Sequence, residues 1–337
     1  MKPPSDVLEI RPYGGESQAE LAPLLREYSY GRYCSDRSLN LEASRRLELD
    51  QLHSYLNQEP TAAWIAVQGG VIVGVLGLRK SKWDTDFWGV KYGNLDHLVV
   101  RGTGAASPEG VAGKLAQTAD AWAKQERMDF MAARVDVFDL PVAHVLQNHG
   151  FRYIETTIIN SFDLKRLDRA PSGEYLMRLA RPDEVDLLMD MATDGFLTHR
   201  FYADKRFPKP KVDEMYRRWV QTSLTNTAVW STVVLEADGR ARGFMTYRVE
   251  DLTPYFGMKF VKWRMAALGK EERGKGHGVN LFVGAMRFVQ DEAGVVDSGL
   301  TIRNIHSFNL HTKVNFRLIC SSLTLHKWYK TDAESDE

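Results

Sequence analysis

The sequence predicts an α/β protein made of two successive domains that share one fold. Three observations support this prediction: a repeated β-hairpin pattern, a repeated long strand late in each half, and a strand, glycine loop and helix in the second half. The two copies of each repeated pattern are separated by about half of the 337-residue chain. Such spacing indicates an internal duplication.

One β-hairpin is predicted in each half of the sequence. Each hairpin joins two apolar runs by a tight turn, Gly69-Gly70 in the first copy and Asp238-Gly239 in the second. The strand runs are 64–67 and 71–78 in the first copy, and 233–235 and 244–247 in the second. An alternating strand closes each copy, beginning near Phe151 and Phe316.

The segment between the copies is rich in charged residues and also contains proline and glycine, a composition typical of a linker. We therefore predict a domain boundary near Ser172. The predicted parts are a first domain at 1–168, a linker at 169–175, a second domain at 176–330 and an acidic tail at 331–337.

The most informative motif is the run Arg273-Gly274-Lys275-Gly276-His277-Gly278. A strand is predicted before it at 260–268, and apolar residues recur at helical spacing after it. The first amides of a helix have no intrahelical partner, and glycine lets the backbone approach a ligand closely. The motif therefore predicts a phosphate-binding loop at a helix N-terminus. A P-loop pattern does not occur here, and an arginine ahead of the glycines is atypical of a dinucleotide fold.

This motif and the residues that follow it resemble the GCN5-related N-acetyltransferase (GNAT) superfamily. The first block fits the family pattern R/Q-x-x-G-x-G/A, and 304–316 partly fits N-x-x-A-x-x-L-Y-x-K-x-G-F. The matching positions are Asn304, Lys313 and Phe316, and the departures are Ser307, His311 and Asn315, which replace the family alanine, tyrosine and glycine. The resemblance implies two tandem GNAT-fold domains, each with a mixed, mostly antiparallel sheet flanked by helices.

The resemblance also implies acetyl-CoA as cosubstrate and no metal. By the family pattern, backbone amides of Ala266, Ala267 and Leu268 serve the thioester carbonyl. The residues implied to hold the CoA pyrophosphate are Arg273, Gly274, Lys275, Gly276, His277 and Gly278. Asn304 is implied to bond the pantetheine arm or a nearby water, and its alternative role is to cap the following helix.

His311 stands where the family tyrosine protonates the departing thiolate, and an imidazole can donate or accept a proton near neutral pH. The alternative is a purely structural histidine. His306, about one and a half turns earlier on the predicted helix, is expected to face another way. Glu250, which follows the 244–249 strand, is the candidate general base, and its alternative role is that of a turn residue.

The first domain is expected to keep the fold without the chemistry. Read literally, Arg101 to Ala106 fits R-x-x-G-x-A. When the two halves are aligned from the following helix, however, Ser107 takes the position of Arg273, and Pro108 suits the first turn of that helix. The first domain is therefore expected to lend surface to the acceptor pocket or to a homodimer.

A narrower resemblance covers the start of the second domain. Residues 200–223 resemble the R-F-x-x-D-x-x-[FIL]…Y-x-x-W-[IV]-x-x-S signature of dTDP-fucosamine acetyltransferase-like sugar N-acetyltransferases, and 83–89 resembles a motif of their N-terminal domain. This resemblance implies acetyl transfer to the amine of a nucleotide-linked amino-deoxy sugar. The implied acceptor-binding residues are Arg200, Phe201, Tyr202, Asp204, Tyr216 and Trp219. Helical spacing alone favours core packing for Tyr216 and Trp219.

Composition narrows the class of partner. The formal net charge is zero, which argues against a nucleic-acid or anionic-membrane partner, and two cysteines make no disulfide framework. A cytoplasmic enzyme acting on a small-molecule amine is expected. Two alternatives remain, a tandem GNAT acyltransferase for another small amine and a non-catalytic acyl-CoA-binding module.

Overall fold

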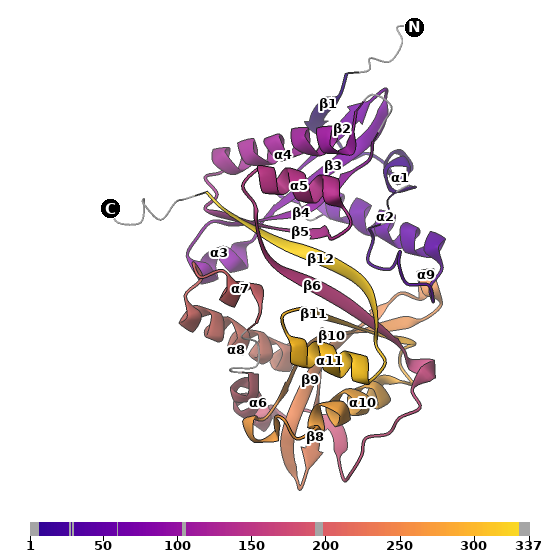
Figure 1. Cartoon of the computed structure of the whole chain (residues 1–337), viewed down its shortest axis with the longest axis vertical. Coiled ribbons are helices and arrows are strands. Elements are labelled where there is room, and N and C mark those ends of the chain that lie inside the picture. Colours follow the sequence, from indigo (N-terminus) through magenta and orange to yellow (C-terminus); the bar gives the residue numbers. More distant parts are fainter. Residues whose placement is uncertain are drawn as a thin grey trace, which may run out of the picture. The chain divides into compact units, whose positions relative to one another are not determined.

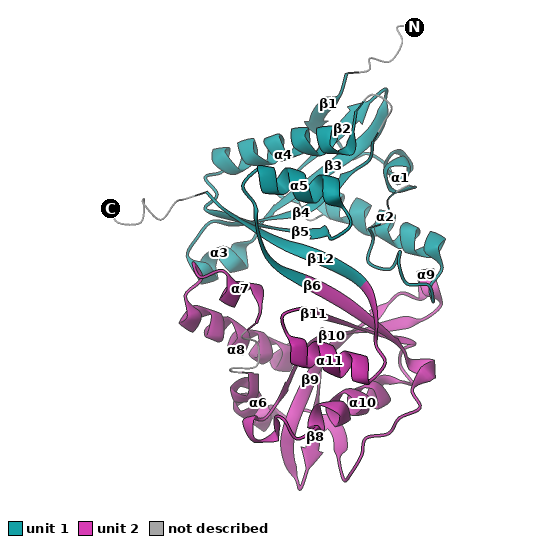
Figure 2. Ribbon diagram, in the orientation of Figure 1, with its two compact units in different colours: residues 1–156, 320–337 teal, residues 157–319 magenta. Residues whose placement is uncertain are grey.

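The computed structural model describes residues 7–26, 28, 30–58, 60–102, 106–192 and 198–329. The chain divides into two compact units (Figure 2). Unit 1 comprises residues 1–156 and 320–337, and unit 2 comprises residues 157–319. The predicted acidic tail at 331–337 and the stretch 103–105 of the literal first-half motif lie outside the described residues.

Unit 1 is an α/β layer structure around a mixed sheet (Figure 1). Its sheet has the strand order β1-β2-β3-β4-β5-β12, in which β4 and β5 are parallel and the other described neighbours are antiparallel. The elements are β1 (Glu9–Pro12), α1 (Gln18–Arg26), α2 (Leu41–Gln58), β2 (Ala62–Gln68), β3 (Val71–Lys80), α3 (Lys82–Trp88), β4 (Tyr92–Val100), α4 (Pro108–Gln125), β5 (Phe130–Asp136), α5 (Leu140–Asn148), the start of β6 (Arg152–Asp163) and most of β12 (Arg317–Trp328).

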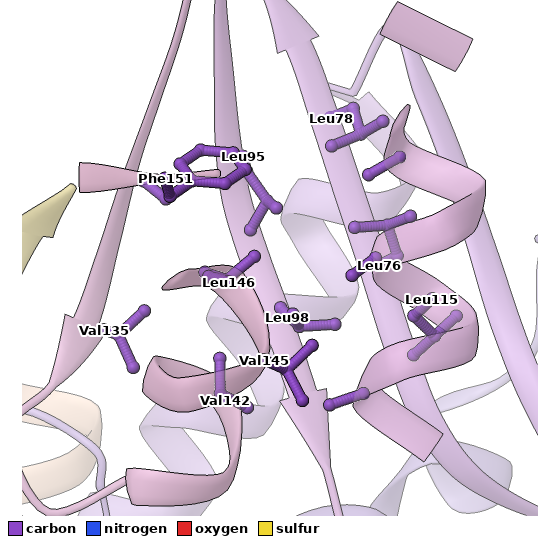
Figure 3. Close-up of a cluster of buried hydrophobic side chains, with 14 of the residues drawn as sticks. Leu76, Leu78, Leu95, Leu98, Leu115, Val135, Val142, Val145, Leu146 and Phe151 are labelled. Carbon is purple, nitrogen blue, oxygen red and sulfur yellow. The ribbon is translucent and has the colours of Figure 1, made fainter. Parts of the chain in front are cut away.

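Alternation along the strands of unit 1 separates two hydrophobic clusters. Leu76 and Leu98 belong to the cluster that includes Leu115 of α4 and residues of α5 (Figure 3). Val75 and Val99, one position away on the same strands, belong to the cluster built with α1 and α2. Because successive side chains of a strand point to opposite faces, both faces of this sheet are covered by helices.

Unit 2 repeats this architecture around a sheet with the order β6-β11-β10-β9-β8-β7. Strands β10 and β11 are parallel, and the other described pairs are antiparallel. The elements, after the C-terminal part of β6, are β7 (Leu176–Leu179), α6 (Val185–Ala192), α7 (Arg200–Ala203), α8 (Lys209–Thr225), β8 (Ser231–Ala237), β9 (Arg240–Asp251), α9 (Thr253–Phe256), β10 (Lys259–Leu268), α10 (His277–Val289), β11 (Val295–Thr301) and α11 (Ile305–Lys313), with 3-10 turns at Leu164–Arg166, Pro182–Glu184 and Lys270–Glu272.

The two faces of the unit 2 sheet carry different side chains. Val261 and Trp263 of β10 lie in a buried cluster with Leu281 and Phe282 of α10. The alternate residues of β9 and β10 face the other side, where α6 contacts both of these strands and α8 contacts β8. The polar residue Lys262 lies on this second face, which therefore combines helix packing with charged groups.

The compact units differ from the consecutive domains that the sequence predicted. Strand β6 pairs with β11 of unit 2 from Thr157 onward, and β12 pairs with β5 of unit 1 from Ser322 onward. Each unit therefore receives a strand from the other half of the sequence. The expected linker at 169–175 lies within unit 2, where Ser172 exchanges hydrogen bonds with Asn280 of α10.

Both predicted hairpins are confirmed as the antiparallel pairs β2–β3 and β8–β9. The predicted closing strands are β6 and β12, preceded by Gly150 and Asn315 in the left-handed conformation, with φ values of 84° and 66°. Asparagine is one of the few residues besides glycine that adopts this conformation readily, which explains how Asn315 replaces the family glycine. No helix in the described part of the chain has the length and apolarity needed to span a membrane.

Candidate functional site

A β-bulge opens the sheet of unit 2. Strands β10 and β11 pair only over Phe260–Trp263 of β10. Beyond that point β10 stays with β9 as far as Leu268, and β11 stays with β6 as far as Thr301. The register between β10 and β9 shifts around Arg264, which marks this residue as the bulge. A bulge bends its strand, so the two parallel strands diverge past Arg264.

A cavity of about 260 Å³ occupies this divergence. Its walls are the C-terminal halves of β10 and β11, the first turns of α10, and α11. The lining residues are Thr198, His199, Met245, Trp263, Arg264, Met265, Ala266, Ala267, Leu268, Gly278, Leu281, Phe282, Ser298, Gly299, Leu300, Thr301, Asn304, His306, Ser307, Leu310 and His311. The sequence-predicted residues Ala266–Leu268, Gly278, Asn304 and His311 are thus brought together in one cavity.

The glycine loop presents unused backbone amides at the start of α10. Gly274 and Gly276 have φ values of 77° and 85°, and Gly276 is the N-cap of the helix. The backbone amides from Gly274 to Gly278 donate no hydrogen bond to another described residue. Five free amides at a helix N-terminus suit an anion such as a pyrophosphate. A Cβ on Gly278 would approach Leu310 to 3.0 Å, which explains the glycine at that position.

The charged side chains of the loop hold its shape. The Arg273 guanidinium donates to the carbonyls of Leu268, at 3.2 Å, and of Met191, at 3.3 Å. The His277 imidazole lies between the Tyr175 hydroxyl and the Glu272 carboxylate. The arginine of the motif therefore ties the loop to the end of β10 and to α6, whereas the side chain of Lys275 is exposed.

The divergence also frees backbone amides on β10. Gly269, directly after the strand, donates its N–H to the carbonyl of Arg242 on β9. Backbone N–H groups alternate in direction along a strand, so those of Ala266 and Leu268 point to the opposite edge, where β11 has moved away. Both residues line the cavity, so these N–H groups are directed towards it.

His311 is buried and bonded on both ring nitrogens. Its Nδ1 lies 2.7 Å from the Ser307 carbonyl oxygen, so Nδ1 carries the proton and donates it. Its Nε2 lies 2.8 Å from the Ser298 Oγ and accepts the hydroxyl proton. Burial lowers the pKa of His311 to about 4, and the ring packs edge-on against Phe282 and Phe316. The imidazole is therefore neutral at pH 7, and its only N–H is already used.

Two further residues of α11 face the cavity. The Asn304 side-chain oxygen accepts a hydrogen bond from the Ser307 amide at 3.1 Å, so it caps the helix and leaves its amide NH₂ for a ligand. His306 also lines the cavity, contrary to the expectation that it faces another way. The cavity wraps around the N-terminal end of α11, so residues on more than one side of its first turn reach it.

Both the sequence and the structure can be set beside those of known proteins. No protein-family model matches the chain. Over 97% of its length, the structure is similar to all of a tandem GNAT protein from the clavulanic acid biosynthesis pathway, with a TM-score of 0.56 and 14% identity. The chain has the tandem GNAT fold.

Two other similar proteins carry sugar-related names. A GNAT region described as a glucosamine N-acetyltransferase, in a fungal multi-domain GH3 β-N-acetylglucosaminidase, has a TM-score of 0.63 and 15% identity, covering 96% of this chain and 38% of that one. Spore coat polysaccharide biosynthesis protein SpsD of Bacillus subtilis (strain 168) is 20% identical over 263 residues, which is 77% of this chain and 86% of SpsD.

The predicted base, Glu250, lies outside the cavity lining of this GNAT fold. Its carboxylate is 3.6 Å from the Lys262 ammonium and 3.9 Å from the Arg248 guanidinium. Lys262 is buried and forms a closer pair, at 2.6 Å, with the buried carboxylate of Asp297. Glu250 is thus part of a charged group on the second face of the sheet. Among the described residues, no three His, Cys, Asp or Glu side chains are grouped to hold a metal ion.

The six predicted acceptor residues do not line the cavity. Phe201 and Tyr216 are 1% and 3% exposed and pack in one aromatic cluster with His199. The Tyr202 hydroxyl donates to Asp213, and Asp204 accepts from the Arg206 amide. The guanidinium of Arg200 lies 4.6 Å from the centroid of the Phe201 ring, and Trp219 packs beside two cavity-lining residues, Arg264 and His199. Core packing, which helical spacing favoured for Tyr216 and Trp219, describes Tyr216, whereas Trp219 is half-buried.

The lining residues that the sequence did not predict include the side chains of His199, Arg264 and Ser298. His199 adjoins the predicted segment, and the family signature could have included it. Arg264 could not be predicted, because the bulge that directs it to the cavity leaves no mark on the apolar pattern of the sequence. Ser298 sits in an ordinary strand, so only the contact with His311 marks it.

The N-terminus of α4 in unit 1 differs from that of α10 in unit 2. The N-cap of α4 is Ser107, whose hydroxyl accepts from the Gly110 amide at 3.1 Å, and Pro108 occupies the first turn. The nearby Arg101 guanidinium donates to the Pro23 carbonyl. At the start of α4, one backbone amide is bonded to Ser107, and Pro108 has no amide hydrogen. Fewer N–H donors therefore remain for an anion than at the start of α10.

Proposed function

We propose that this chain is an acetyl-CoA-dependent N-acetyltransferase that acts on the amine of a nucleotide-linked amino-deoxy sugar. The observation that carries the proposal is the combination in unit 2 of a bulge-opened strand pair, β10 amides directed towards the resulting cavity, and a glycine loop with free amides beside it. Each feature alone is common among α/β proteins, whereas their combination suits acyl transfer from CoA.

The residues present fit acetyl-CoA as a cosubstrate. The amides from Gly274 to Gly278 would bind its pyrophosphate, and Asn304 would donate to the pantetheine arm in the cavity. Lys275 would add positive charge at the rim. This predicted division of roles leaves Arg273 to hold the loop through its two carbonyl contacts.

Acetyl-CoA supplies a thioester carbon for attack by the acceptor nitrogen, with a C–N bond forming and the C–S bond breaking. As negative charge develops on the carbonyl oxygen, the amides of Ala266 and Leu268 would donate to it, a contribution worth about 3 kcal/mol. The amine loses one proton, and the departing sulfur needs one. Glu250 remains the predicted acceptor of the amine proton, directly or through water.

The role of His311 in this scheme is to hold the Ser298 hydroxyl at the cavity wall. With Nδ1–H donated to Ser307 and Nε2 accepting from Ser298, the ring has no second proton to deliver at neutral pH. Direct protonation of the thiolate by His311 would require the imidazole to be charged first. We therefore assign it an orienting role and leave the thiolate proton to solvent.

The acceptor class is supported by the resemblance of 200–223 to sugar N-acetyltransferases and by the names of two similar proteins. One belongs to polysaccharide biosynthesis and the other is described as a glucosamine N-acetyltransferase region. The second name refers to an amino sugar and the first to polysaccharide synthesis, and the nucleotide-linked form is the more specific part of the proposal.

The first test is release of free thiol from acetyl-CoA with a panel of acceptors. The panel contains dTDP- and UDP-linked amino-dideoxy sugars, the same sugars as methyl glycosides, and simple amines. Thiol release that depends on a nucleotide sugar supports the whole proposal. Release with other amines alone keeps the acetyltransferase and discards the acceptor class.

A binding measurement covers the remaining outcome. If acetyl-CoA binds but no acceptor in the panel is acetylated, the chain behaves as an acyl-CoA-binding module towards these compounds, and the sugar proposal fails. If acetyl-CoA does not bind at concentrations near 1 mM, the predicted cosubstrate is wrong.

A further inference from the structure

The bulge places an unusual pair of arginines on the second face of the unit 2 sheet. The Arg264 guanidinium carbon lies 4.4 Å from the centroid of the Trp230 ring and 5.5 Å from that of Trp219. The Arg248 guanidinium carbon lies 5.7 Å from the same Trp230 ring. Two cations therefore share one indole, which positions both guanidinium groups without neutralising them.

The positive charges of Arg264 and Arg248 are not balanced by closely paired carboxylates. Within the described part of the chain, the Arg264 side chain makes no hydrogen bond or ion pair. Arg248 has one carboxylate nearby, Glu250 at 3.9 Å, and Glu250 lies closer to Lys262. Partial desolvation, and then the charge of Arg248, lower the pKa of Arg264, whose side chain nevertheless stays exposed to solvent.

Other arginines of unit 2 show the ordinary arrangement. The Arg217 guanidinium meets the carboxylate of Asp190 at 2.9 Å, and Arg218 meets Glu214 at 2.7 Å. Arg242 contacts Glu272 at 2.9 Å. Arg264 thus differs from these three arginines, and together with Arg248 it leaves exposed positive charge that an anion can approach.

The position of Arg264 connects this charge to the reaction site. Arg264 lines the cavity, next to the point where β10 and β11 separate. Leu268, beside the glycine loop, is four residues further along β10, which corresponds to about 13 Å of extended chain. An anion at Arg264 would thus lie well away from the amides of the glycine loop, beside the part of the cavity where β10 and β11 separate.

We propose that Arg264 and Arg248, held against Trp230, bind the diphosphate group of the acceptor. This inference rests on the proposed function, because it assigns the anion to the acceptor molecule. Guanidinium groups match phosphate oxygens with paired N–H donors, and a diphosphate can engage two of them at once. The site would select nucleotide-linked amino sugars over the free amino sugars that carry the same amine.

The test compares two acceptors in the steady state, the nucleotide-linked amino sugar and its methyl glycoside. The variants are Arg264→Gln and Arg248→Gln, and Arg217→Gln is the matched control because it removes a paired arginine from α8. We expect Arg264→Gln to raise the KM for the nucleotide sugar about 10- to 100-fold, with the KM for the methyl glycoside and for acetyl-CoA within about twofold of wild type. Arg217→Gln should change none of these values.

A second measurement works without turnover. Binding of dTDP is followed by calorimetry in saturating CoA, so that the glycine loop is already occupied. Wild type and Arg217→Gln should bind dTDP, and Arg264→Gln should bind it at least tenfold more weakly. Inorganic pyrophosphate in the same experiment tests whether the diphosphate alone suffices.

Each failure has its own signature. Equal losses with both acceptors, or unchanged dTDP binding in Arg264→Gln and Arg248→Gln, would overturn the diphosphate site even if nucleotide sugars are acetylated. Absence of acetylation with every sugar, together with dTDP binding that depends on Arg264, would reject the proposed acceptor amine while keeping the anion site. Loss of acetyl-CoA binding in Arg264→Gln would assign these arginines to CoA.

Discussion

His311 provides a prediction whose size follows from its surroundings. An exposed histidine has a pKa near 6.5, whereas burial lowers that of His311 to about 4 in the folded chain. Between these two pH values the unfolded chain binds a proton that the folded chain excludes. The free energy of unfolding therefore falls as the pH is lowered from 6.5 to 4, and the contribution of this residue amounts to about 3 kcal/mol.

The perturbation is His311→Phe, which keeps an aromatic ring against Phe282 and Phe316 and removes the titrating group. Guanidinium denaturation of wild type and variant, at several pH values between 7 and 4, gives the difference in their free energies of unfolding. The free energy of unfolding of wild type minus that of the variant should fall by about 3 kcal/mol from pH 7 to pH 4, because only wild type loses the contribution of His311. His144→Gln is the control, because His144 is exposed on α5.

The refuting result is a difference between wild type and His311→Phe that does not change with pH. It would mean that His311 titrates alike in the folded and unfolded chains, which its two hydrogen bonds and burial do not allow. Nuclear magnetic resonance of labelled histidines offers a direct check, since the His311 signal should titrate well below pH 6.5. The same result would bear on catalysis: a ring neutral above pH 6 contributes no ionisation to the pH profile near neutrality.

Three other predictions concern the loop, the cap and the buried ion pair. Gly276→Ala and Gly257→Ala should each cost about 1–2 kcal/mol, because both glycines have positive φ and open space around a new Cβ, but only Gly276→Ala should weaken acetyl-CoA binding in calorimetry. Asn304→Ala should lower the free energy of unfolding by about 1 kcal/mol in denaturant melts, whereas Asn304→Asp should keep the helix cap. If the KM for acetyl-CoA rises in both variants, the Asn304 amide group binds the pantetheine arm. Asp297→Ala should cost about 3–5 kcal/mol, since it removes the closer of two carboxylates beside the buried Lys262 ammonium, and adding Lys262→Met should recover much of the loss in thermal unfolding.

Local signals in the sequence predicted much of unit 2. The glycine hexamer, the strand before it and the apolar spacing behind it place β10, the loop and α10 correctly, because each depends on near neighbours in the chain. The capping role open to Asn304 could also be inferred, since a cap acts over only three residues. The fold class followed from these elements together with the repeated hairpins.

Features that depend on distant partners could not be predicted. Nothing near Arg264 in the sequence signals a bulge, because the bulge is defined by the register with β9. Ser298 becomes notable only when α11 brings His311 to it. The assignment of Tyr216 to the acceptor followed a family resemblance, whereas its helical spacing predicted the buried position that it occupies.

The exchange of strands between the halves affects how the chain can fold during synthesis. Strand β5 finds its partner β12 only after residue 322 has been made, long after the rest of the unit 1 sheet is available. Until then the edge of β5, which includes the buried residues Phe130, Met131 and Val135, has open hydrogen-bonding groups and can pair with other nascent chains. Completion of unit 1 therefore follows translation, and pairing over such a sequence separation makes it slow. Translation arrest after residue 168 should leave an aggregation-prone chain rather than a finished domain.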